Sequence, residues 1–159
     1  MMQTFLLLKT LHVVTATLLF GTGLGTAFFM WRAHRSGEVG VIAVVSRNVA
    51  LADWLFTTPA VILQPATGFA LLHMAGLDWR TGWVLASLGL YLLAGACWLP
   101  VVAIQLRVAR LAAAAAATAQ PLPGAYFRLM RLWFALGWPA FIAVLLVFWL
   151  MVAKPDLAL

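Results

Sequence analysis

The sequence has very little charge: only 9% of its 159 residues are Asp, Glu, Lys or Arg, while 65% are hydrophobic. About a quarter of the residues of a typical soluble domain are charged, so this composition excludes a soluble protein. We therefore expect an integral membrane protein whose main surroundings are the lipid bilayer. Any chemistry must then take place within a helix bundle or at its two faces.

Residue patterns that support common chemistries are also absent. The single cysteine, Cys97, excludes a disulfide within the chain. Neither HExxH nor CxxC occurs, so a zinc site is not indicated. No serine, histidine and acid gather at one depth, which argues against a hydrolase. The two halves show no inverted repeat, which argues against a two-sided transporter.

Four apolar stretches reach the length of about 20 residues that a membrane-spanning helix needs. They cover roughly residues 4–31, 51–74, 82–105 and 132–153. The sequence thus predicts an all-α fold, a single domain over residues 1–159 built as a bundle of four transmembrane helices. Strong helix formers extend the third helix to about residue 120. The segment "VIAVVSRNVA" fits either a stretch along the membrane surface or an early start of the second helix.

The start of the chain does not resemble a secretory signal, because "MMQTF" is not basic and the apolar run after it is too long. We expect the first span to be retained. The basic residues are unevenly distributed over the predicted loops. Three of them fall on the side of the termini, and seven on the other side: Arg32, Arg35, Arg47, Arg107, Arg110, Arg128 and Arg131.

This asymmetry predicts that both basic loops are cytoplasmic and that both termini face outward, across the inner membrane of a bacterium. The net charge of +6 is then a topology signal, and we expect no nucleic-acid partner. Gly21 and Gly25 form a GxxxG pattern, which permits close helix packing either within the bundle or in a homo-oligomer.

Lys9 and His12 are two ionisable residues inside the first apolar stretch. At about 1.5 Å per residue, Lys9 lies about 7 Å and His12 about 12 Å beyond Thr4. Lys9 can extend its amine to the interface or bind an anion. The shorter imidazole of His12 cannot reach the interface, so it either bonds a neighbouring helix or binds a ligand. We favour a ligand, because a buried neutral imidazole binds metals.

The second helix carries a polar stripe. At about 100° per residue, one face holds Asp53, Thr57, Gln64, Thr67 and Gly68. We expect this face to line the bundle interior. Gln64, beside Pro65, can bond a freed backbone carbonyl or the edge of a ligand. Asp53 is interpreted as a charge at a helix N-terminus or as a partner of Arg47.

Further candidates lie in the outer half of the predicted bundle. His73 is on the same side as His12, but it points about 180° away from Gln64 around the helix. It is either an axial ligand or an exposed interfacial histidine. Met151 and Tyr91 are alternative second ligands or lining groups.

Haem b fits these residues, because it needs only one or two axial side chains, an apolar bundle interior, and cations for its propionates. Lys9, Arg80 and Lys154 all fall at the outer face. We therefore expect His12 to bind iron and Lys9 to pair with a carboxylate. The predicted cofactor-binding set is His12, Lys9, Gln64, Thr67, Arg80, Tyr91 and Lys154, and the predicted metal ligands are His12, His73 and Met151.

Four segments resemble a bacterial integral membrane family called domain of unknown function 2269. They are "KTLHVVTATLLFGTGLGTAFFMW", "FTTPAVILQPATGFALL", "WLPVVAIQLR" and "YFRLMRLWFALGWPAFIAVLLVFWLMVAKP". The resemblance implies four spans and no activity. More distantly, K-x-L-H and "TTPA...TG" resemble the HemJ-type membrane protoporphyrinogen oxidases, which are haem b proteins. That resemblance implies a haem role for His12, but the lysine and histidine of that family's third span are missing here.

Three functions follow from these observations. The first is a b-type haem protein that passes electrons, with quinol or a porphyrin as partner, which makes a haem-dependent oxidoreductase one form of this hypothesis. The second is a copper or other soft-metal binder that uses His12, His73, Met74 and Met151. The third is a cofactor-free membrane scaffold or accessory subunit whose polar groups join helices.

Overall fold

The computed structural model describes residues 2–157, and this part of the chain is helical apart from short connections. The elements are α1 (Met2–Ser36), α2 (Val39–Ala52), η1 (Asp53–Thr57), α3 (Thr58–Met74), α4 (Gly82–Ala117) and α5 (Gly124–Ala153). The chain continues from α2 through the π-helical turn η1 into α3 without a break, so residues 39–74 form one long helix. Four helices are thus long and apolar enough to cross a membrane, which confirms the predicted all-α architecture.

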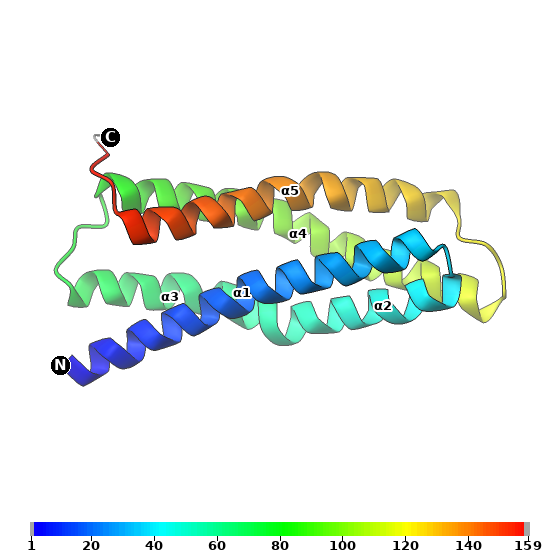
Figure 1. The fold of residues 1–159 in the computed structure, drawn as a ribbon, viewed down its shortest axis with the longest axis horizontal. Helices are drawn as coiled ribbons and strands as arrows, with labels where there is room; N and C mark the ends of the chain where they lie inside the picture. The colour runs from blue at the N-terminus through cyan, green and yellow to red at the C-terminus, as the bar shows by residue number, and fades with distance from the viewer. Residues whose placement is uncertain (1, 158–159) are drawn as a thin grey trace.

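The four helices run side by side, and both ends of the chain lie at the same end of the molecule (Figure 1). We call this end, which also holds the connection over residues 75–81, the terminal end. The opposite end holds residues 37–38 and 118–123 and most of the arginines, and we call it the basic end. Because the segment "VIAVVSRNVA" belongs to α2, the second helix starts early instead of following a surface stretch.

The helices are longer than a bilayer is thick. They contain 30 to 36 residues, which corresponds to about 45–54 Å, whereas the hydrocarbon layer measures about 30 Å. Arg107 and Arg110 of α4 and Arg128 and Arg131 of α5 are exposed. Since charged side chains avoid the hydrocarbon layer, the excess length extends beyond it at the basic end.

Buried apolar residues form two separate clusters. The larger occupies the basic half and contains Met30, Ala33, Ile42, Val49, Val101, Ile104, Val108, Ala112, Tyr126, Met130 and Trp133. The smaller, at the terminal end, contains Trp83, Val84 and Leu150. The first 25 residues of α1 that the structure describes, 2–26, belong to neither cluster. The terminal half of α1 is therefore held mainly by other contacts.

Prolines interrupt the hydrogen bonding of the spanning helices, and the structure compensates for one of them. Pro65 has no N–H for the carbonyl oxygen of Val61, one turn earlier. The hydroxyl of Tyr91 on α4 donates to that oxygen at 2.5 Å instead. Such a substitute donor allows proline inside a membrane helix.

The GxxxG pattern of α1 makes no packing contact with the rest of residues 2–157. Among these residues, a methyl group added at Gly21 or Gly25 would meet no atom within 4 Å. The packing of these glycines in a homo-oligomer stays a prediction.

Candidate functional site

The imidazole of His12 is half-buried and turned toward α3. Its Nδ1 lies 2.7 Å from Oγ1 of Thr67, a residue that is 4% exposed. The two residues are 55 positions apart in the chain, so this hydrogen bond joins α1 to α3. His12 is therefore tied to a neighbouring helix through one of its two ring nitrogens.

The partners of Thr67 determine which nitrogen of His12 carries the proton. The hydroxyl of Thr67 donates to the carbonyl oxygen of Leu63, at 2.7 Å, with the carbonyl oxygen of Gln64 at 3.2 Å. When this hydroxyl donates its single proton to the Leu63 carbonyl, Oγ1 of Thr67 accepts a hydrogen bond from Nδ1–H of His12. We therefore assign the proton to Nδ1.

This tautomer leaves a lone pair on Nε2 of His12. Within residues 2–157, the side-chain hydrogen bond of the ring runs through Nδ1. A histidine that binds a metal almost always donates its other ring N–H to a fixed acceptor, which sets both tautomer and orientation. His12 and Thr67 reproduce that arrangement. The ring can thus offer one nitrogen to a metal while α3 holds the other.

A second hydrogen bond between α1 and α3 lies next to the first. The hydroxyl of Thr15 donates to Oε1 of Gln64 at 2.7 Å, and the carbonyl oxygen of His12 is 3.0 Å from the same hydroxyl. Thr15 is 3% exposed. The side chain of Gln64 therefore bonds a threonine on α1, whereas the carbonyl that Pro65 frees is bonded by Tyr91.

Gly68 allows the His12 ring to approach α3 closely. A Cβ at this position would lie 3.3 Å from Cε1 of His12 and 4.0 Å from Nδ1, so even one added methyl group would press on the imidazole. Together, His12, Thr15, Gln64, Thr67 and Gly68 make one contact between the two helices. We call these five residues the His12 site.

The predicted cations lie at or near the terminal end, but none of them is part of the His12 site. Lys9 is exposed on α1. The guanidinium carbon of Arg80 lies 5.3 Å from the ring centre of Trp79. The amine of Lys154 lies 5.8 Å from the ring centre of Trp83. All three side chains are exposed.

The predicted additional ligands occupy separate positions. His73 is exposed in the last turn of α3. Met151 is 38% exposed near the end of α5. The hydroxyl of Tyr91 is engaged with the Val61 carbonyl. Within residues 2–157 no three His, Cys, Asp or Glu side chains gather closely enough to hold a metal ion.

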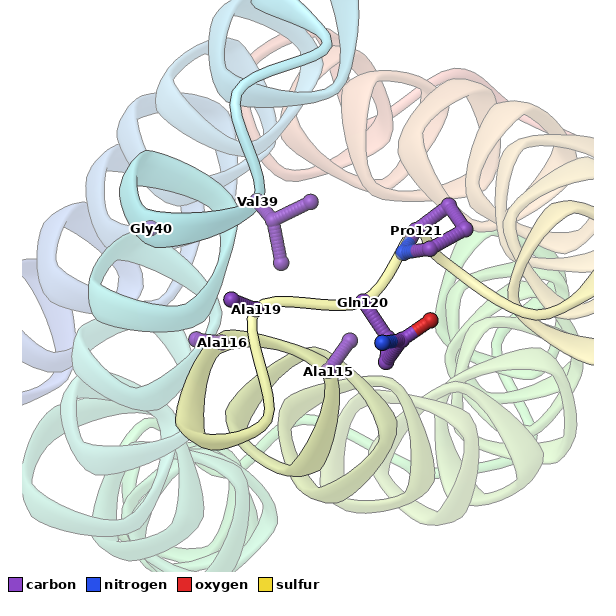
Figure 2. A pocket seen from close by; sticks show the side chains of 7 residues that line it. All are labelled: Val39, Gly40, Ala115, Ala116, Ala119, Gln120 and Pro121. Carbon is purple, nitrogen blue, oxygen red and sulfur yellow. The ribbon is translucent and has the colours of Figure 1, made fainter.

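Neither of two surface hollows is lined by the His12 ring. One, of about 380 Å³, lies at the basic end between the start of α2 and the end of α4, where Val39 and the small residues around Ala115 form its wall (Figure 2). No ionisable side chain lines it. The other, of about 270 Å³, follows α1 beside Lys9 and Val13.

Sequence reasoning missed two features and misplaced a third. Thr15 was not predicted, although it follows His12 by three residues and therefore shares its side of the helix. Gly68 was placed on the polar stripe, but its contact with the imidazole was not foreseen. Asp53 does not begin a helix and does not pair with Arg47. It lies within a continuous helix, 5% exposed, and bonds Thr57 at 2.8 Å.

That interpretation of Asp53 is wrong because the helical hydrogen bonds already start at Val39, so Asp53 lies inside the helix and not at its N-terminus.

Comparison with curated proteins gives no match, and neither does comparison with solved structures. A family model described as "Predicted integral membrane protein (DUF2269)" matches residues 6–155. Since this match spans nearly the whole chain, the protein belongs to the DUF2269 family of integral membrane proteins.

Proposed function

We propose that this chain is a b-type haem-binding membrane protein that transfers electrons near its terminal end, with Nε2 of His12 as an axial ligand of the iron. One observation carries the proposal: Nδ1 of His12 lies 2.7 Å from Oγ1 of Thr67, and when the Thr67 hydroxyl donates to the Leu63 carbonyl, its oxygen accepts from Nδ1–H. The imidazole is thereby held as the neutral tautomer that binds metals through Nε2.

The donor set suits an iron porphyrin better than a bare ion. A zinc site needs three or four protein ligands, and residues 2–157 contain no such group of His, Cys, Asp and Glu. A porphyrin supplies its own equatorial nitrogens, so one histidine is enough. When bound, haem b supplies one-electron redox chemistry.

The residues around His12 then have distinct roles. Thr67 orients the imidazole, and Gly68 gives it room beside α3. Lys9, Arg80 and Lys154 are exposed cations in the terminal half, where they can pair with propionate carboxylates. The apolar residues of α1 that face away from α3, such as Leu7 and Val13, can contact the macrocycle or lipid.

The direction of the chain in the membrane follows from its arginines. We place the basic end in the cytoplasm and the terminal end outside, across the inner membrane of a bacterium, because positive charge is retained on the cytoplasmic side. The His12 site then lies toward the outer face, where quinol within the lipid layer is a suitable electron donor.

The test is an absorption spectrum of the protein purified in detergent, recorded as reduced minus oxidised. Wild type should show the Soret and α bands of haem b, and His12→Ala should lose or strongly alter them. His34→Ala is the matched control, because His34 bonds Tyr126 at the basic end and should leave the bands unchanged. A change in His73→Ala would identify that residue as the second ligand.

The hydrogen bonds of His12 and Thr15 also support a second function, that of a cofactor-free scaffold. The two side-chain hydrogen bonds between α1 and α3 are also explained if their whole role is to join the helices. A colourless, metal-free and stably folded preparation would select this function. Stoichiometric copper without porphyrin would instead select the soft-metal binder.

A further inference from the structure

A second polar cluster lies at η1, separate from the His12 site. Asp53 is 5%, Thr57 5% and Gln105 4% exposed. The hydroxyl of Thr57 donates to Oδ1 of Asp53 at 2.8 Å, and the side chain of Gln105 on α4 lies next to the Asp53 carboxyl group. We call these three residues the Asp53 cluster. It joins η1 to α4 inside the bundle.

The Asp53 carboxyl group has no cationic partner. Within residues 2–157, the hydroxyl of Thr57 is the side-chain group that bonds it, and Thr57 and the neighbouring Gln105 are both neutral. Helices α1, α2 and α3 pack against η1. The charged side chains on these helices and on α4 are exposed: Lys9, Arg32, Arg35, Arg47, Arg107 and Arg110. An isolated buried carboxylate inside a membrane protein is strongly disfavoured.

The side chain of Gln105 also has a polar group without a partner. Its Oε1 is buried and has no hydrogen-bond partner within residues 2–157. Its amide N–H groups are the only donors in the side chain, so only they can bond the carboxyl group of Asp53 while that group is charged. The structure thus places an acceptor that lacks a donor next to a carboxyl group that lacks a cation.

One proton on the Asp53 carboxyl group would give the acceptor a donor and would remove the unpaired charge. A protonated carboxyl group has an O–H donor, and a carboxylic acid can pair with a primary amide through two hydrogen bonds. The amide N–H donates to the carboxyl oxygen, while the acid O–H donates to Oε1. Protonation also removes the buried charge. The widened turn of η1 is a further pointer, since π-helical turns are frequent at functional sites.

We propose that Asp53 and Gln105 form a proton-binding site within the bundle, in which Asp53 is protonated at neutral pH and donates to Oε1 of Gln105. Binding takes up one proton and converts the carboxylate into a neutral acid, and release returns that proton. The site does not depend on haem at His12, and it gives the protein a group that can exchange a proton inside the membrane.

Infrared spectroscopy of the purified wild-type protein in lipid nanodiscs tests the proposal. A carbonyl band of a protonated carboxylic acid should be present at neutral pH, and it should shift when aspartate is labelled with ¹³C at its carboxyl carbon. The chain has only four carboxyl side chains, and the other three, Glu38, Asp78 and Asp156, are exposed. The band should disappear in Asp53→Asn and persist in the control Asp78→Asn.

Gln105→Leu gives an independent readout, because it removes the acceptor and keeps the acid. The band should remain but move to higher frequency as its hydrogen bond is lost. Absence of the band in wild type at neutral pH would overturn the proposal, even if Asp53→Asn failed to fold. So would its persistence in Asp53→Asn. Loss of the band on adding sodium chloride, but not choline chloride, would show a sodium site and overturn it as well.

Discussion

Tyr91→Phe should destabilise the protein, because it removes the hydroxyl that bonds a carbonyl group freed by proline. In the structure the Tyr91 hydroxyl donates at 2.5 Å to the carbonyl oxygen of Val61, which Pro65 cannot bond. Phenylalanine keeps the ring and removes only the oxygen. Val61 is then left with an unsatisfied acceptor in an apolar interior.

The expected decrease in the free energy of unfolding is bounded by two sets of typical values. Leaving a buried acceptor unsatisfied costs about 1–3 kcal/mol, while hydrogen bonds between membrane helices contribute about 0.6 kcal/mol on average and about 1.7 at most. Because water and other donors are scarce at Val61, we expect about 1–2 kcal/mol for Tyr91→Phe. Pro65→Ala restores an N–H that can bond Val61. In that background the same substitution should cost less than half as much.

The assay is reversible unfolding of each variant in mixed micelles, followed by circular dichroism, as a double-mutant cycle over Tyr91 and Pro65. The reasoning predicts a coupling free energy of about 1 kcal/mol between the two positions. An equal loss for Tyr91→Phe in both backgrounds would refute it, because the tyrosine would then act through packing and not through the freed carbonyl.

Three further predictions concern the His12 site. Gly68→Val should displace the imidazole and weaken cofactor retention, since a Cβ would already lie 3.3 Å from Cε1; Gly95→Val is the control, because nothing lies within 4 Å of a Cβ there. Thr67→Val should raise the midpoint potential in a redox titration, because loss of the bond to Nδ1 makes His12 a weaker donor. Thr15→Val should destabilise the fold by about 0.6–1.7 kcal/mol; unfolding equal to wild type would show that its bond to α3 contributes nothing.

Much of the fold is predictable from the sequence, because the hydrocarbon layer imposes a simple rule on backbone hydrogen bonds. The four apolar stretches coincide with four helices. The early start of α2 was open, since "VIAVVSRNVA" suits both a stretch along the membrane surface and the beginning of a helix. Only the packing of Ile42 and Val49 into the larger core cluster decides it.

The site was less predictable. Helical periodicity gathers His12 and the polar stripe of α3 into plausible partners, yet it cannot show that Thr67 bonds one particular ring nitrogen. That result depends on the angle between two helices and on the absence of a side chain at Gly68. The error on Asp53 arose because the start of the second helix was open in the sequence, and the structure places it at Val39, well before Asp53.

The central claim is that Nε2 of His12 binds the iron of haem b. The most direct measurement is chemical rescue: His12→Gly protein is prepared, its absorption spectrum is recorded, and imidazole is added. We predict that wild type shows a Soret band, that His12→Gly loses or strongly shifts it, and that imidazole restores the wild-type spectrum. A wild-type protein without the band, or a His12→Gly protein with an unchanged spectrum, would contradict the claim.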